Sequence, residues 1–284
     1  MSRRSDRFWR GMMAVCAVIA VACISVMLYI LAAQRRTASV LKAAASDPLR
    51  VERVENTDAE PEAVDSTGVT PQEPGKRVQP TSEKVTVPID FAYLQGINPD
   101  VYAWIVMPLS GQEYPILQNS EDDGTYLRRD IYGQYAAGGS LFTEAHHNTR
   151  SFDDPCTVVY GHNMSSGAMF GSLERSLQTM DLDDEEDERN YLTVYTPTAI
   201  RKYRIVCAGS YNSDNILYHH SFAQSEGLEE FLRDFAGYPE GGYVQCADRT
   251  PDCEDRILIL STCYRRSYQN RYLVMAVLTE QHGA

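Results

Sequence analysis

Six short runs of apolar and β-branched residues recur from residue 84 onward, and they constrain the fold more than any other feature of the chain. Segments rich in Gly, Asn, Asp and Pro separate the runs, which is the pattern of short strands joined by turns. Many short strands of this kind indicate a barrel or a sandwich, so we expect a mainly β domain. The runs are KVTV (84–87), TVVY (157–160), YLTVY (191–195), KYRIVCA (202–208), RILILST (256–262) and YLVMAVL (272–278).

Two segments have features of helices instead. The segment DFAYLQGINPDVYAWI (90–105) is expected to begin with a short helix. In EGLEEFLRDFAG (226–237) the apolar residues follow at helical spacing, with Ser225 ahead as a candidate N-cap and Gly237 as a stop. We expect both helices at the periphery of the β domain.

The N-terminal part of the chain differs from the rest in hydropathy and charge. Residues 1–10 contain four arginines, and the 23 residues from Gly11 to Ala33 contain no charged side chain. As a helix, this segment would span roughly 35 Å, enough to cross the hydrocarbon core of a bilayer. A cleaved signal peptide usually has a shorter apolar region, of about 7–15 residues. We therefore expect an uncleaved transmembrane anchor over 11–33, a cytoplasmic N-terminus over 1–10, and the rest of the chain outside.

Residues 34–83 have the composition of a flexible extracellular linker. Five prolines occur among Glu, Asp, Ser, Thr and Ala, and hydrophobic periodicity is absent. The folded domain is therefore expected at 84–284.

The acidic balance of the chain excludes one class of partner. The 39 acidic and 26 basic residues give a formal net charge of −13. A nucleic-acid-binding surface needs a basic face that neutralises phosphates, so we expect no nucleic-acid partner.

The run DLDDEEDE (181–188) has seven acids in eight positions. Carboxylates are suitable calcium ligands, but the run lacks the Gly-containing DxDxDG spacing. An acidic turn or the start of a helix is therefore the expected structure, and we expect no metal and no cofactor.

Seven cysteines are present, two of them in the predicted anchor. Cys246 and Cys253 flank a polar loop and could close a disulfide in an oxidising compartment. Cys156 and Cys207 are expected to be small buried hydrophobic residues. The chain has no CxxC pair, so a structural zinc site is not expected.

Cys263 differs from the other cysteines because it stands at the end of a predicted strand, next to a basic stretch. It follows ILILST, and Arg265, Arg266 and Arg271 lie within eight residues of it. A cysteine nucleophile needs a nearby cation or base, because a free thiol with a pKa near 8.5 is mostly protonated at neutral pH. Arg271 begins the next predicted strand, so an antiparallel pair could bring it alongside Cys263. Taken alone, the pattern fits a chance cysteine in a basic loop equally well.

Among the six histidines, His162 has the most suggestive position for a partner base. It follows the strand TVVY and Gly161. A histidine after a strand is more often structural than catalytic. The doublets at 146–147 and 219–220 are expected in loops, with solvated or hydrogen-bonded roles. The pattern alone therefore does not pair His162 with Cys263.

Several local sequences resemble those of the sortases, membrane-anchored cysteine transpeptidases of Gram-positive bacteria. They are YGHNM followed by MFGSL, then LSTC, and Arg271 opening RYLVMAVL. The upstream blocks NPDVYAWIVMPLSGQEYPILQ and TYLRRDIYGQYAAGGSLFTE are similar to class B sortases in particular. The resemblance covers roughly residues 88–280 in order.

This resemblance implies that residues 84–284 are a catalytic domain, an eight-stranded β-barrel with peripheral helices. It also implies three catalytic residues. Cys263 would be the nucleophile and His162 the general acid and base. Arg271 would hold the substrate and stabilise the oxyanion of the tetrahedral intermediate.

The resemblance further implies which residues contact the substrate. Asp123, where asparagine is common in class B, and Leu127 would help to bind the sorting signal. Ser261 and Thr262 would lie at the edge of the active site. Tyr264 follows the cysteine, where the family often has an acidic residue. The residues at 123 and 264 thus depart from the family pattern, which bears on substrate specificity.

The implied reaction cleaves a C-terminal sorting signal after threonine, through a thioacyl enzyme. It joins the released protein to an amine of a peptidoglycan precursor or to a pilin lysine. The implied partners are surface proteins that carry the signal, and the implied location is the cell membrane, with one span and the catalytic domain on the extracellular face.

Two alternatives stay open. One is a cysteine protease of papain or caspase type, which the order of His162 before Cys263 and the absence of a QACxG-type motif disfavour. The other is a tethered extracellular domain that binds a ligand or a cell-wall partner.

Overall fold

The computed structural model describes two units of the chain, residues 1–46 and residues 47–284. The described residues of the first unit are helical. Within the described residues, none of the helices combines the length and the apolar character needed to cross a membrane. The predicted cytoplasmic segment and the predicted linker lie outside the described residues. The structure describes residues 12–13, 15–25, 27–28 and 32 of the first unit, and residues 86–238, 245–264 and 267–283 of the second.

The second unit is built mainly from strands, most of which the sequence predicted. The strands in the described residues are β1 (Val101–Met107), β2 (Gln112–Leu117), β3 (Leu141–Phe142), β4 (Cys156–Gly161), β5 (Tyr191–Tyr195), β6 (Ala199–Asn212), β7 (Gln245–Cys246), β8 (Ile257–Tyr264) and β9 (Ser267–Gly283).

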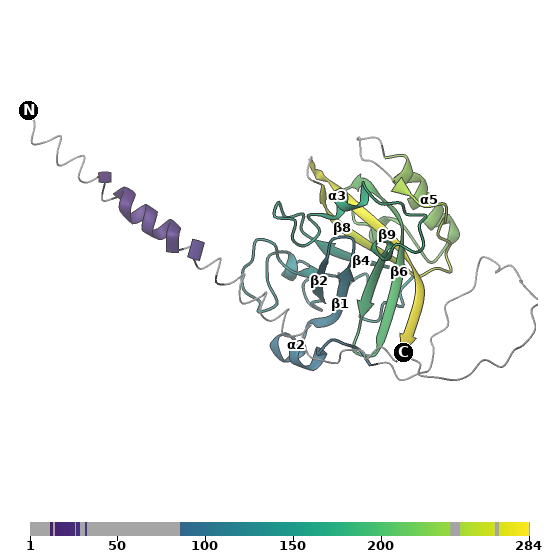
Figure 1. Ribbon diagram of the computed structural model, residues 1–284, viewed down its shortest axis with the longest axis horizontal. Coiled ribbons are helices and arrows are strands. Elements are labelled where there is room, and N and C mark those ends of the chain that lie inside the picture. Colours follow the sequence, from purple (N-terminus) through teal and green to yellow (C-terminus); the bar gives the residue numbers. More distant parts are fainter. Residues whose placement is uncertain are drawn as a thin grey trace, which may run out of the picture. The chain divides into compact units, whose positions relative to one another are not determined.

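In the part of the chain that the structure describes, eight of these strands close into a barrel, as the resemblance implied. They follow one another in the order β5-β1-β2-β3-β4-β8-β9-β6, and β6 pairs again with β5. The short β7 pairs with β6 on the edge opposite β9. Figure 1 shows the two longest strands, β6 and β9, side by side. Within this largely antiparallel barrel, β4 and β8 are a parallel pair.

Short helices occupy the connections between strands. Figure 1 shows α2 and α5 outside the barrel, as expected. The helices in the described residues of the second unit are α2 (Phe91–Ile97), the 3₁₀ turn η1 (Thr125–Leu127), α3 (Leu173–Leu177), the 3₁₀ turn η2 (Glu188–Asn190), α4 (Ile216–His219) and α5 (Ser225–Ala236).

Two details of the predicted elements are wrong. The predicted strand at 84–87 does not form in its described half, because Pro88 interrupts the run and Asp90 then caps α2, its carboxylate accepting the Tyr93 N–H at 2.8 Å. The N-cap of α5 is Gln224 rather than Ser225. Ser225 is the first helical residue, and its hydroxyl lies 3.2 Å from the Cys253 thiol.

The sheet is packed on both faces. The barrel interior is filled by one face of the strands, including Val159, Leu260 and Val274. The outer face of β4, β6, β8 and β9 forms a second core with Phe231 and Phe235 of α5. Each fully buried apolar side chain contributes about 1.5–3 kcal/mol to stability, so the outer core holds α5 firmly against these four strands.

A disulfide joins Cys207 on β6 to Cys246 on β7, and their Cα atoms are 4.1 Å apart. The disulfide considered between Cys246 and Cys253 is therefore wrong, and so is the prediction of Cys207 as only a buried hydrophobic residue. Cys253 has a free thiol. The chain returns after α5 to place Cys246 directly opposite Cys207 in the sheet, a long-range pairing that sequence spacing does not show. Cys156 is free and buried, as predicted.

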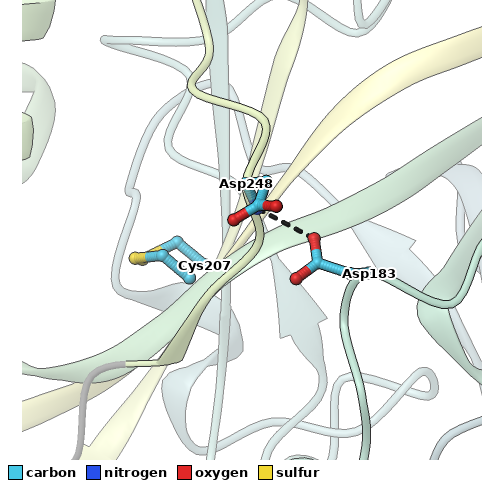
Figure 2. The surroundings of a disulfide bond; sticks show 4 residues. Asp183, Cys207 and Asp248 are labelled. Carbon is cyan, nitrogen blue, oxygen red and sulfur yellow. Dashed lines mark hydrogen bonds between the residues drawn. A yellow bond between two sulfur atoms is a disulfide. The ribbon is translucent and has the colours of Figure 1, made fainter.

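Figure 2 shows a hydrogen bond close to this disulfide. The Asp248 N–H donates to the carboxylate of Asp183 at 2.8 Å. It connects the segment after β7 to the acidic run. The disulfide and this hydrogen bond together attach β7 and the residues directly after it to the rest of the domain.

The acidic run 181–188 forms a turn that leads into η2, as expected from the sequence. Glu185 pairs with Arg204, and Glu188 pairs with Lys202 at 3.1 Å, both on β6. Among the described residues, no group of three or more His, Cys, Asp or Glu side chains is arranged to hold a metal ion. These two carboxylates attach the acidic run to the outside of the barrel.

Candidate active site

The three predicted catalytic positions meet where β4, β8 and β9 lie side by side. Gly161 is opposite Thr262 in the parallel pair, so His162 and Cys263 are the next residues along β4 and β8. In the antiparallel pair of β8 and β9, Cys263 is opposite Arg271. Because adjacent strands lie about 4.8 Å apart, the backbones of His162 and Arg271 flank that of Cys263.

The period of two along a strand places these positions on the outer face of the sheet. Ile259 of β8 and Leu273 of β9 belong to the outer core. Cys263 and Arg271 follow and precede them at even spacing, so they occupy positions on the same face. Tyr160, near the end of β4, packs against this core as well.

The backbone of His162 is held by a loop that folds back onto the end of β4. The Phe170 N–H donates to the His162 carbonyl at 3.0 Å. Phe170 and Leu141 cover Gly161 so closely that a Cβ there would lie 2.7 Å and 2.5 Å from their side chains. A larger residue at this position would therefore displace Leu141 or Phe170, both of which are buried.

The imidazole of His162 contacts the main chain of η1. Its Nε2 lies 2.8 Å from the Leu127 carbonyl oxygen. A carbonyl oxygen can only accept a hydrogen bond, so Nε2 carries the proton. In the neutral ring, Nδ1 is then the nitrogen that can accept a proton. Leu127 therefore lies beside the site through its carbonyl group, a contact that the sequence did not reveal, while its side chain is 46% exposed.

Asp123 lies near η1, and its carboxylate is bound to the turn after β3. One oxygen accepts the Ala145 N–H at 2.6 Å, and the other lies 2.6 Å from Nδ1 of His146. His146 thus has the hydrogen-bonded loop role expected of its doublet. The role of Asp123 in binding a sorting signal stays a prediction.

The remaining predicted substrate residues lie on β8. Ser261 and Thr262 are both buried, each with 3% of its surface exposed. Tyr264 is opposite Ser267, where β8 turns into β9. Residues 265–266, which include two of the arginines noted in the sequence, lie outside the described residues. Contact of Ser261, Thr262 and Tyr264 with substrate stays a prediction.

Glu144 was not singled out from the sequence, yet it connects three segments beside the site. One of its oxygens accepts a hydrogen bond from Asn215 Nδ2 at 2.7 Å and one from the Tyr160 hydroxyl at 3.3 Å. Asn215 also caps α4, so Glu144 joins that helix to the end of β4. The signal in the sequence was an acid two residues after the apolar pair LF of SLFTE.

The pKa of Tyr160 depends on two charged residues near it. Burial raises the pKa of Tyr160 above its usual range, and the Glu144 carboxylate raises it further. The Arg271 guanidinium has the opposite effect on this pKa. The Tyr160 phenol is therefore influenced by a carboxylate and a cation, and the cation belongs to the residue opposite Cys263 in the register.

Comparisons with known proteins identify relatives of one kind. Sortase B of Listeria monocytogenes is 28% identical over 172 residues, which are 60% of this chain and 65% of that protein. The chain thus spans slightly less than two thirds of the length of this relative. No family model matches the chain.

Solved structures agree in fold. Sortase B of Clostridium perfringens superimposes with a TM-score of 0.53 at 25% identity, covering 67% of this chain and 100% of that one. A Bacillus anthracis protein described as similar to sortase B gives a TM-score of 0.53 at 27% identity, covering 71% of this chain and 88% of that one.

Proposed function

We propose, from the premise that this chain belongs to the sortase family and is similar to its class B members, that it is a cysteine transpeptidase. Cys263 is the nucleophile, His162 the general acid and base, and Arg271 the cation that stabilises the oxyanion. The observation that carries the proposal is the register of three neighbouring strands, which places Cys263 between the other two residues.

The first half of the reaction forms a thioester. The Cys263 thiolate attacks the carbonyl carbon of a threonine in the sorting signal, and the carbonyl electron pair moves to oxygen. The oxyanion collapses, the peptide C–N bond breaks, and the leaving amine takes a proton from the His162 imidazolium. Because Nε2 donates to the Leu127 carbonyl, Nδ1 is the nitrogen that transfers this proton.

The second half transfers the acyl group. An amine of the acceptor attacks the thioester and loses a proton to His162, and the thiolate of Cys263 leaves. The product is a new amide, and the enzyme returns to its starting state. Arg271 acts in both halves, since each passes through an oxyanion; one such donor contributes about 3–4 kcal/mol to transition-state stabilisation.

The setting of this chemistry is also part of the proposal. Residues 11–33 hold the chain at the cell membrane, and the catalytic domain lies on the extracellular face. There it acts on surface proteins with a C-terminal sorting signal, and the acceptor is a peptidoglycan amine or a pilin lysine. The uncharged 23-residue segment supports the anchor. The disulfide between Cys207 and Cys246 supports an oxidising compartment.

The test uses the full chain in detergent and a set of quenched peptides of NPxTx, LPxTG and SPxTG types. Each peptide is incubated with and without an amine acceptor, beside a Cys263→Ala variant. We expect cleavage that depends on Cys263 and a product joined to the amine. Cleavage without amine product would identify a cysteine protease. If the folded protein forms no thioacyl adduct with any peptide, a tethered binding domain becomes the better description.

A further inference from the structure

A cavity with cationic walls lies at η1, the turn whose Leu127 carbonyl contacts His162. Its volume is about 310 Å³. The residues that line it come from η1 and its flanks and from the loop that follows: Asp122, Gly124, Thr125, Arg128, Arg129 and Tyr135. Leu127, whose carbonyl holds the His162 imidazole, stands between two of these residues in the chain. The cavity therefore lies next to the main-chain group that orients the proposed acid and base.

The loop that carries the arginines is tightly built. Arg129 and Tyr135 form an isolated β-bridge. Inside this turn the buried carboxylate of Asp130 accepts the N–H groups of Tyr132 and Gln134 at 3.0 and 2.9 Å. The backbone at the cavity wall is thus fixed before any ligand binds, which lowers the entropy cost of binding.

The two arginines donate only to loop carbonyls. Arg129 Nη1 donates to Gly133 O at 2.9 Å, and Arg128 Nη1 donates to Ala137 O at 3.4 Å. No carboxylate of the described residues forms an ion pair with either one. Several other arginines of the described residues do have such partners: Arg150, Arg189, Arg201, Arg204 and Arg249. In a chain of net charge −13, two adjacent arginines without a carboxylate stand out as a binding surface for an anion.

One acid also lines the cavity, and its oxygens are engaged locally. Asp122 accepts the Gly124 N–H at 3.0 Å and the Thr125 hydroxyl at 3.1 Å. Against two guanidinium groups, the cavity keeps an excess of positive charge. A guanidinium presents paired N–H groups that match the two oxygens of a carboxylate.

We propose that this cavity binds a carboxylate of a peptide substrate, with Arg128 and Arg129 as its ligands. The proposal rests on the proposed function and adds a specificity determinant to it. The carboxylate belongs either to an acidic side chain of the sorting peptide or to the molecule that supplies the acceptor amine. The two sources share one chemistry and are separated by experiment.

The test compares the full chain with an Arg128→Gln/Arg129→Gln double variant. Arg233→Gln, which removes an exposed arginine of α5, is the control for loss of a surface charge away from the cavity. In the sorting-peptide arm, quenched peptides carry Glu or Gln next to the cleaved motif. In the acceptor arm, diglycine is compared with diglycine amide. We expect wild type to favour the carboxylate-bearing member in one arm by about threefold to tenfold, and the preference to fall as salt screens the charges. The double variant should lose this preference, while Arg233→Gln should keep it.

Equal rates for both members of each pair in wild type would overturn the proposal, as would a preference that survives in the double variant. A binding measurement separates this failure from failure of the proposed function, because it needs no turnover. N-acetylglutamate should shift the NMR signals of the Tyr135 ring in wild type and not in the double variant. If wild type cleaves no peptide yet shows this shift, the carboxylate-binding cavity is supported and the transpeptidase activity is not. The absence of the shift contradicts the cavity.

Discussion

The parallel strands β4 and β8 place a cysteine near each end of one strand pair, and the two ends have different surroundings. At the starting end, Cys156 is opposite Ile257, is 3% exposed and belongs to the outer core. Burial raises the pKa of its thiol well above the ordinary range. At the finishing end, Cys263 is opposite Arg271 and next to His162 in the register.

The difference shows that position along the strand pair, rather than the strand itself, determines what a thiol can do. An apolar surrounding favours the neutral thiol, whereas a cation and an imidazole favour the thiolate. Because β4 and β8 run in the same direction, the segments that follow them leave from the same edge. A histidine far upstream of Cys263 is thereby brought next to it.

The largest effect should come from exchanging the cysteine at the finishing end. Cys263→Ala should reduce transpeptidation by at least about 10³-fold, because it removes the proposed nucleophile that forms the thioester. The measurements are the rate of peptide turnover and the mass of the acyl adduct. Cys156→Ala is the matched control and should retain the activity. An acyl adduct on Cys156, or activity that survives in Cys263→Ala, would remove the distinction between the two ends.

A smaller loss is expected when the cation opposite Cys263 is neutralised. Arg271→Gln should lower kcat by about 10²–10³, the cost of removing one oxyanion donor. Arg271→Lys keeps the charge but not the planar fork, so it should lose less. Steady-state kinetics on the cleaved peptide give both numbers. A change confined to KM in both variants would assign Arg271 to substrate binding alone.

The disulfide lies on neither end of the strand pair, so its loss should affect stability and not chemistry. Cys246→Ser should lower the free energy of unfolding by about 2–4 kcal/mol, because the bond between Cys207 and Cys246 closes a long loop, with a sequence separation of 39. Urea unfolding measures this, and peptide turnover in native buffer should be unchanged. Cys253→Ser should leave the unfolding midpoint where it is. Equal destabilisation by both variants would argue that β7 is not held by this bond.

The smallest effect concerns pH and the starting end. The pKa of Cys156 is raised in the folded protein, so as pH rises above about 8.5 the unfolded chain loses its thiol proton first. This group therefore destabilises the fold only above that pH, by about 1–2 kcal/mol at pH 10. The urea midpoint should fall between pH 7.5 and pH 10, and it should fall less in Cys156→Ala than in wild type.

In the folded protein, iodoacetamide should modify Cys263 and spare Cys156. Rapid alkylation of Cys156 at pH 7.5 would contradict its burial.

The sequence predicted local structure well and long-range contacts poorly. The runs that became β4, β5, β6, β8 and β9 were recognisable from composition, and the helical spacing of α5 was correct. The closed barrel, however, followed only from the resemblance, because no local pattern specifies which strands pair. The disulfide failed for the same reason: Cys246 reaches Cys207 through strand pairing, not through proximity in the chain.

The candidate site shows the same limit. His162, Cys263 and Arg271 were identified by their motifs, and the strand register brings their positions together. The contacts around them were not predictable, since Glu144 meets Tyr160 and Asn215 only in the folded state.

The hydrogen bond between His162 and the Leu127 carbonyl has a consequence for how this protein tolerates genetic change. The acceptor is a main-chain atom, so every amino acid at position 127 supplies it. A complete substitution scan of that position would register only the loss of the side chain and would leave the contact undetected. A one-residue deletion between 128 and 139, which shifts the backbone itself, is the genetic change that would reveal it.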